Sequence, residues 1–239
     1  FPYLIYNPEE TDPTKQGKNL FRMSSLGSGP FEEVDFDMVV GNPPFKRGGL
    51  KKEEKDYLNK KGYAQELVLA FLDRVTTLAP NAKYGLVCGS KPLLFNNGKP
   101  YQDFRKFLFN ENYVDKVYNF SILRKGAKKE GGRNLFASAV SPISIVFYSK
   151  QIPANPSEKL MYCAPKTAIK NRIIDGIAID KTDVSYLPRV ECQKPDSKIW
   201  KVAMWGTERD FQLVQTMWQN ANLKDHLNQN NWKIGRGFQ

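Results

Sequence analysis

The sequence is poor in the residues that most enzymes use for acid–base, nucleophilic or metal chemistry. Its 239 residues include one histidine, His226, and three widely separated cysteines, Cys88, Cys163 and Cys192. No CxxC or HxxxH spacing occurs, so no metal site is expected, and isolated cysteines of this kind fit a reducing cytoplasm. His226 has no Gly-x-Ser-x-Gly partner, which argues against a Ser-His-Asp or Cys-His nucleophile system.

Long hydrophobic runs are missing as well. No stretch approaches the ~18 apolar residues that a membrane helix requires, and the first residues lack the basic start of a signal peptide. We therefore expect neither a membrane-spanning nor a secreted protein. Hydrophobic residues at 41% and charged residues at 26% instead fit a folded chain.

Acidic residues are outnumbered by basic ones. The chain has 36 Lys and Arg against 25 Asp and Glu, a formal net charge of +11. This excess suits a polyanionic partner, and nucleic acid is the commonest one. The chain also begins without Met and stops inside a segment typical of a fold interior, so we expect a fragment of a longer protein.

The order of hydrophobic patterns predicts an α/β fold. Short apolar runs predict four strands, and periodic apolar stripes predict two helices. The expected strands are residues 36–41, 83–89, 113–120 and 143–148, and the expected helices are residues 64–79 and 101–110. No helical pattern separates the last two strands, which predicts an antiparallel pair in a sheet of mostly parallel strands.

Other segments differ in composition from these strands and helices. Residues 46–62 are polar and charge-dense, which predicts a mobile surface segment. Two prolines, Pro153 and Pro156, mark a boundary near residue 155, beyond which residues 208–222 predict a helix. We therefore place one unit at residues 1–155 and a second, smaller one at residues 156–239.

The most informative segment is Asn42-Pro43-Pro44-Phe45, which follows the first expected strand directly. Ligands in open α/β sheets bind just beyond the carboxyl ends of strands. Two prolines fix the backbone and leave its carbonyls as rigid acceptors beside the Asn42 side chain. Such an acceptor pair can take both hydrogens of an NH₂ group, while Phe45 offers a flat surface for an aromatic ring.

This set of groups is sufficient for methylation of an aromatic amine. The nitrogen lone pair of such an amine is delocalised into its ring, so the amine is a poor nucleophile. Two acceptors on its hydrogens favour the pyramidal form and free the lone pair to attack an electrophilic methyl group. A base in duplex DNA must also be flipped out of the stack, and a stacking ring offsets part of that cost.

The segment Gly41-Asn42-Pro43-Pro44-Phe45 resembles motif IV of the amino-group methyltransferases that use S-adenosylmethionine, especially the adenine-N6 DNA methyltransferases. Its surroundings resemble large restriction-modification enzymes of the type IIG kind. The matching segments are Asn19-Leu20-Phe21, Gly29-Pro30-Phe31, Asn119-Phe120-Ser121 and Leu135-Phe136-Ala137. The resemblance implies part of a Rossmann-like class I methyltransferase fold over residues 1–155, then a linker and the start of a target-recognition region.

The resemblance also implies roles for individual residues. Asn42 and the carbonyl of Pro43 hold the target amine, Pro44 completes the motif, and Phe45 and Phe136 contact the two sides of the base. Ser24 aligns with the position that contacts the cofactor adenine. The family's Gly-rich cofactor loop is absent from this sequence, so we expect that loop upstream and the chain inactive by itself.

A basic, Gly-rich segment follows the third expected strand. We expect its cationic side chains to contact the phosphates of double-stranded DNA: Arg124, Lys125, Lys128, Lys129 and Arg133. The lysines of residues 51–61 are interrupted by acidic residues, so a solvated surface and a DNA contact are equally compatible with them.

Three alternatives stay open at this point. The same motif occurs in enzymes that methylate guanine N2 of ribosomal RNA or a glutamine side chain of a protein. A DNA-binding module without catalysis is the third, although the intact Asn42 and Phe45 count against it. An endonuclease domain in the same full-length chain is compatible with the sequence.

Overall fold

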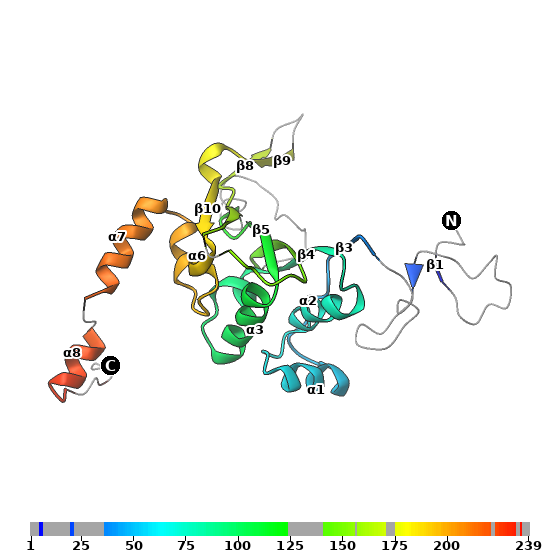
Figure 1. Cartoon of the computed structure of the whole chain (residues 1–239), viewed down its shortest axis with the longest axis horizontal. Coiled ribbons are helices and arrows are strands. Elements are labelled where there is room, and N and C mark those ends of the chain that lie inside the picture. Colours follow the sequence, from blue (N-terminus) through cyan, green and yellow to red (C-terminus); the bar gives the residue numbers. More distant parts are fainter. Residues whose placement is uncertain are drawn as a thin grey trace.

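The computed structural model describes residues 5–6, 20–21, 36–123, 141–155, 157–170, 175–220, 223–232 and 235, and the structural statements below concern these residues. Its centre is a six-stranded sheet (Figure 1). In spatial order the strands are β10 (Val184–Pro188), β7 (Lys159–Cys163), β5 (Tyr113–Asn119), β6 (Ile143–Ser149), β4 (Lys83–Gly89) and β3 (Met38–Gly41). Two short segments, β1 (Ile5–Tyr6) and β2 (Leu20–Phe21), pair in parallel outside it.

Strand directions confirm the expected mixed topology. Strands β3, β4, β5 and β7 run one way, because β3 pairs in parallel with β4 and β5 with β7, while β6 is antiparallel to both β4 and β5. Strand β10 is antiparallel to β7. The antiparallel pair predicted for residues 113–120 and 143–148 is therefore present, and four of the six strands share one direction.

Two helices cover one face of the sheet. Helix α2 (Leu67–Leu78) packs on β4 and α3 (Lys99–Asn110) on β5. Both were predicted, although α2 begins at Leu67 rather than at residue 64. A short π-helix, η2 (Lys91–Phe95), follows β4. The core between these helices and the sheet consists of fully buried side chains, among them Leu69, Leu72, Phe104, Leu108, Val117 and Val146.

The prediction of a mobile surface segment at residues 46–62 is wrong, because residues Lys52–Lys61 form helix α1. Leu58 is fully buried under it, and Lys61 pairs with the buried Asp73 of α2 at 2.9 Å between Nζ and Oδ2. The helix ends at Gly62, whose φ of 72° suits glycine and whose N–H returns to the carbonyls of Leu58 and Asn59. A single buried leucine among many charges leaves little hydrophobic periodicity to detect.

Strand β3 is largely exposed, although its apolar composition is typical of a buried strand. Met38 is 64% exposed and Val40 70% exposed, and β3 is the edge strand of the described sheet. An edge strand has a hydrogen-bonded neighbour on one side only, here β4. Apolar composition therefore identified the strand correctly but not its position in the sheet.

The sheet continues past residue 155, through β7 and β10. Helices α5 (Arg189–Cys192) and α6 (Lys198–Ala203) then pack back on it. The fully buried Trp200 contacts Phe109 of α3, with ring centroids 5.0 Å apart, and Tyr162 of β7, at 5.9 Å. The hydrophobic core thus spans the position where the sequence suggested a boundary.

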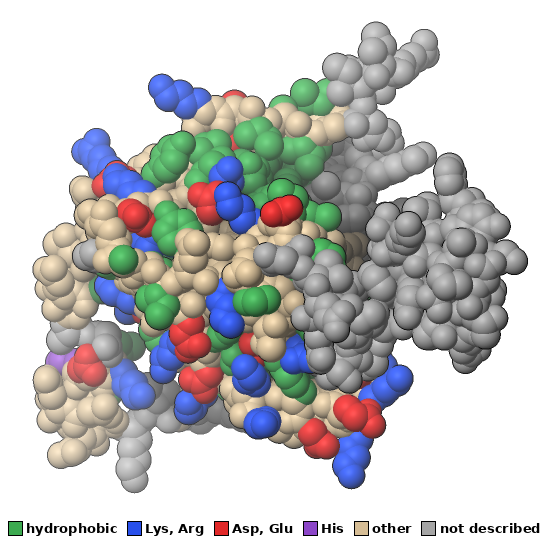
Figure 2. All heavy atoms as spheres, turned by 45° about the vertical axis from the view of Figure 1, so that its right-hand side comes forward, with side chains coloured by type: hydrophobic (Ala, Val, Ile, Leu, Met, Phe, Trp, Pro, Cys, Tyr) green, Lys and Arg blue, Asp and Glu red, His purple; other side chains and the backbone are tan. Residues whose placement is uncertain are grey.

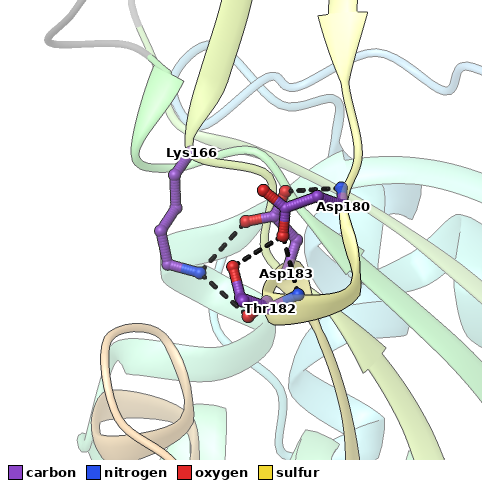
Figure 3. A network of polar contacts seen from close by, with 4 residues as sticks. All are labelled: Lys166, Asp180, Thr182 and Asp183. Atoms are coloured by element: carbon purple, nitrogen blue, oxygen red, sulfur yellow. Dashed lines mark hydrogen bonds and ion pairs between the residues drawn. The ribbon is translucent and has the colours of Figure 1, made fainter.

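A polar turn leads into β10. After the hairpin of β8 (Thr167–Lys170) and β9 (Asp175–Ala178), residues Lys181–Asp183 form the 3₁₀ turn η3. Figure 3 shows Lys166 reaching across to the carboxylate of Asp183 and to the carbonyl of Thr182, at 3.1 and 3.2 Å from its Nζ. Asp180 accepts hydrogen bonds from the backbone N–H and hydroxyl of Thr182. These contacts secure the buried Asp183 at the start of the strand.

The predicted C-terminal helix is present as α7 (Glu208–Trp218), and α8 (Leu223–Gln229) follows it. Both extend away from the sheet (Figure 1). His226 lies on α8, where its ring meets the edge of Trp232. Among the described residues no helix is long and apolar enough to cross a membrane.

Replacing Leu58 by Ala should lower the free energy of unfolding by about 2–4 kcal/mol, because it leaves a cavity beneath α1. Urea denaturation followed by circular dichroism measures the change. The exposed neighbour Lys60→Ala is the matched control and should stay within about 0.5 kcal/mol of wild type. Equal stabilities of the two variants would contradict the buried position of Leu58.

Candidate active site

The Asn-Pro-Pro-Phe segment follows β3 directly, at the edge of the sheet where β3 and β4 both end. Gly41 is the last residue of the strand and pairs with Leu86 of β4. Asn42 and Pro44 are exposed, whereas Pro43 is buried. The motif therefore lies at the carboxyl end of a parallel pair, the place where ligands of open α/β sheets bind.

Phe45 lines a pocket of about 130 Å³ at this edge, and its ring is 36% exposed. A cavity of about 150 Å³ holds a single benzene ring, so the pocket has room for one aromatic ring rather than for a whole nucleotide. It is lined by Phe45, Arg47, Glu66, Val68, Gly89, Lys91, Pro92, Ser141 and Pro142. Asn42, Pro43 and Pro44 are not among the lining residues, and they precede Phe45 along the chain.

The far wall of the pocket comes from the end of β4 and the start of β6. Gly89 lies so close to Pro92 that a Cβ atom there would be 3.1 Å from the proline Cδ. The N–H of Ser90 donates to the carbonyl of Pro142 at 2.9 Å, which joins the two segments. This wall is therefore closely packed and holds its shape without a ligand.

A buried polar network lies beneath that wall. The hydroxyl of Ser90 contacts the Ser144 hydroxyl at 2.7 Å and the Asn119 amide oxygen at 3.2 Å. The amide nitrogen of Asn119 donates to the hydroxyl of Tyr162 at 2.7 Å. All four side chains are fully buried. Satisfied buried networks of this kind rigidify a core, and this one links the ends of β4, β5, β6 and β7.

The charged side chains of the pocket come from three elements. Arg47 belongs to the loop after the motif, Lys91 to η2, and Glu66 to the start of α2. The guanidinium of Arg47 pairs with the Glu66 carboxylate at 3.1 Å. Figure 2 shows acidic and basic side chains interspersed over the described surface in view. The described basic side chains on that face are thus not gathered into one patch.

Several predicted site residues lie outside the described part of the chain. They are the phosphate contacts Arg124, Lys125, Lys128, Lys129 and Arg133, the second base contact Phe136, and the cofactor position Ser24. Their roles stay predictions. The residues that follow the segment 124–140, Ser141 and Pro142, do line the pocket.

None of the three cysteines lines this pocket. Cys88, Cys163 and Cys192 are unpaired and buried, and burial raises the pKa of all three thiols. The pKa of Cys163 rises to about 11, mainly through burial, with the Asp183 carboxylate adding to the shift and Lys166 opposing it. A raised pKa keeps a thiol protonated and unreactive at neutral pH. Within the described residues no group of three His, Cys, Asp or Glu side chains could hold a metal ion.

Larger cavities lie elsewhere among the described residues. One of about 530 Å³ runs along β10 towards α7, one of about 480 Å³ lies on the sheet near the amino-terminal ends of β4 and β5, and one of about 340 Å³ lies between α6 and α7. None of the three includes a residue of the Asn-Pro-Pro-Phe motif. The motif, and not size, therefore selects the candidate site.

Comparison with known proteins identifies the family of the chain. The family model of the Eco57I restriction-modification methylases matches residues 4–125, about half of the chain. The chain belongs to this family. No curated protein sequence matches it at a significant level.

Solved structures are similar to this chain at low sequence identity. The type IIG restriction endonuclease BpuSI is 14% identical, with a TM-score of 0.51, and the match covers 89% of this chain and 25% of that one. A type I restriction-modification methyltransferase subunit from Streptococcus thermophilus is 18% identical, with a TM-score of 0.46 over 77% of this chain and 36% of that one. This methylase chain therefore spans about a quarter to a third of the solved proteins it matches.

Sequence reasoning missed Glu66, Arg47 and Lys91 at the site. Glu66 had been assigned to the interior of a helix that starts at residue 64, where a carboxylate carries no special signal. In the structure it is the residue before α2 and is 5% exposed. An isolated Glu inside a strongly apolar stripe was the available sign of a buried charge.

The raised pKa of Cys163 makes the stability of the fold pH-dependent. Between pH 9 and about 11 the folded thiol keeps its proton while the unfolded thiol loses it, so the free energy of unfolding falls as the pH rises. Cys163→Ala should therefore lose about 1–2 kcal/mol less than wild type between pH 8 and pH 10.5. Urea denaturation at both pH values measures this, and parallel pH profiles would contradict it.

Proposed function

We propose that the protein carrying this chain transfers a methyl group from S-adenosylmethionine to N6 of a flipped-out adenine in double-stranded DNA, as the modification activity of a restriction-modification system. The observation that carries the proposal is the position of Asn42-Pro43-Pro44-Phe45. The motif stands at the carboxyl end of a parallel strand, with Phe45 on the wall of a ring-sized pocket.

The chemistry follows from the groups at this position. The exposed Asn42 amide oxygen and the backbone carbonyl of Pro43 accept the two hydrogens of the adenine amine. This favours a pyramidal nitrogen whose lone pair is available for attack on a methyl group. Phe45 stacks on the base and offsets part of the few kcal/mol that flipping costs. No histidine is required at any point.

S-adenosylmethionine supplies the electrophilic methyl group of this reaction. The described residues at the motif do not form a site of its size, because the pocket of about 130 Å³ is well below the roughly 300–1,000 Å³ of pockets for ligands of that kind. The described residues of this chain therefore serve to bind the target amine.

Net charge supports DNA as the substrate. An excess of 11 positive charges favours association with a phosphate backbone, and the matched BpuSI is a type IIG restriction endonuclease. The affinity of the protein for DNA should consequently fall steeply as salt concentration rises. An endonuclease domain in the same full-length protein is part of this proposal.

Single-molecule sequencing of the host genome, with and without the full-length gene, tests the proposal directly. Loss of N6-methyladenine at one sequence motif on deletion would support it and identify the recognition site. An unchanged methylation map, with the gene expressed, would overturn it. Methylation of ribosomal RNA or of a protein glutamine would then be assayed in the same strains.

Replacing Asn42 by Ala should lower the rate of DNA methylation at least 100-fold, because one of the two acceptors of the amine is lost. Tritiated S-adenosylmethionine and duplex DNA measure the rate with the whole protein. DNA affinity, measured by fluorescence anisotropy, should change less than threefold, since phosphate contacts dominate it.

The matched control is Asn110→Ala, at the exposed end of α3, which should leave the rate unchanged. Full activity of Asn42→Ala would show that the motif does not act on the amine. DNA binding without methylation by the wild-type protein would favour the DNA-binding module instead.

A further inference from the structure

The loop that presents Phe45 is attached to the start of α2. The carbonyl of Lys46, the residue after Phe45, accepts a hydrogen bond from the N–H of Leu67 at 2.9 Å. One residue further on, the guanidinium of Arg47 reaches the carboxylate of Glu66 at 3.1 Å. Two adjacent residues of the loop are thus held by two adjacent residues of the helix terminus.

Glu66 is an unusual partner for a loop, because its carboxylate is buried. Its side chain is 7% exposed, whereas that of Arg47 is 57% exposed. A buried carboxylate is costly unless it is paired and hydrogen-bonded. The same oxygen that faces Arg47 also accepts a hydrogen bond from the hydroxyl of Tyr101 on α3, at 2.7 Å. Burial and this contact raise the pKa of Tyr101.

The carboxylate therefore joins three parts of the molecule at one atom, Oε1 of Glu66. They are the loop of the motif, the start of α2 and the first turn of α3. Tyr101 is partly buried against the core, so it provides a fixed point. Glu66, Arg47 and Phe45 all line the same pocket of about 130 Å³.

We propose that Glu66 is a positioning residue that holds the Phe45 loop, through Arg47, in the orientation that stacks on the target base. This inference rests on the proposed function. The carboxylate does not touch the amine. It fixes the loop against the two helices so that Phe45 and the preceding Asn-Pro-Pro are in place before the base arrives.

The loop has a second feature that suits a fixed shape. Gly49 has a φ of 60°, in the left-handed region that favours glycine, and the following Leu50 is buried. The segment from Phe45 to Leu50 is therefore held by the Lys46 carbonyl, the Arg47 ion pair and the buried Leu50. Of these, Arg47→Met removes the ion pair and leaves the Lys46 carbonyl, the buried Leu50 and the Tyr101–Glu66 hydrogen bond in place.

Hydrogen exchange of the Leu67 amide, which donates to the Lys46 carbonyl, tests the structural half of the inference without any assay of activity. Glu66→Ala should speed exchange of this amide at least tenfold, while exchange in β4, β5 and β6 stays unchanged. Glu66→Gln keeps an oxygen for Tyr101 and Arg47, so exchange should stay within threefold of wild type. Unchanged exchange in Glu66→Ala would overturn the inference whatever the enzyme methylates.

Kinetics of the whole protein test the functional half. Glu66→Ala should lower kcat for DNA methylation 10- to 100-fold and change KM for DNA less than threefold, and Glu66→Gln should recover at least a third of the wild-type kcat. Arg47→Met should reproduce most of the loss, and the double variant Arg47→Met with Glu66→Ala should lose no more than Glu66→Ala.

The control is Glu53→Gln on the exposed side of α1, which should leave both constants unchanged. Wild-type kcat in Glu66→Ala would overturn the positioning role, as would a loss of kcat in Glu66→Ala that Glu66→Gln does not recover. If Glu66→Ala does not fold, Arg47→Met and Tyr101→Phe carry the same test, each with a melting temperature to confirm folding. Absence of DNA methylation by the wild-type protein is a failure of the proposed function instead, and leaves the exchange result to decide the inference.

Discussion

The parallel pairing of β3 with β4 is the constraint on which the rest of the site depends. Because both strands run the same way, both end at one edge of the sheet, and the residues that follow them meet there. The antiparallel β6 begins at the same edge, since Ile143 pairs with Gly89. Three chain segments that are far apart in sequence therefore form one pocket, with Phe45, Gly89 and Pro142 on its wall.

Rigidity at this edge comes from polar contacts that are buried rather than exposed. Ser90, Asn119, Ser144 and Tyr162 satisfy one another beneath the pocket. Removing one partner of such a network leaves the others unpaired at a cost of about 1–3 kcal/mol each. The arrangement suits a site that must present fixed hydrogen-bond acceptors to an amine. Ordering flexible acceptors would cost free energy and reduce the stabilisation of the transition state.

Much of this structure could be predicted from the sequence. Strands β3, β4, β5 and β6, helix α3 and the antiparallel β5–β6 pair follow from the hydrophobic pattern, and the motif after β3 identified the candidate site. Strands β7 to β10 were not predicted. Helix α1 was missed because its stability depends on one buried leucine and one ion pair to α2, and neither leaves a periodic pattern. Glu66 and the Ser90 network were missed for a related reason, since their bonded partners lie 19 to 54 residues away in the sequence and meet only in the folded structure.

The hydrophobic core extends across residue 155, and this limits where two such sequences can be recombined. Trp200 fills the space between α3 and β7, and Phe211 of α7 belongs to the same hydrophobic core, so the residues up to Phe211 belong to one packed body. A chimaera joined at residue 155 would separate two strands from their sheet and expose Phe109 and Tyr162 to water. Recombination that preserves the fold would instead join sequences beyond Phe211, where α7 extends away from the sheet.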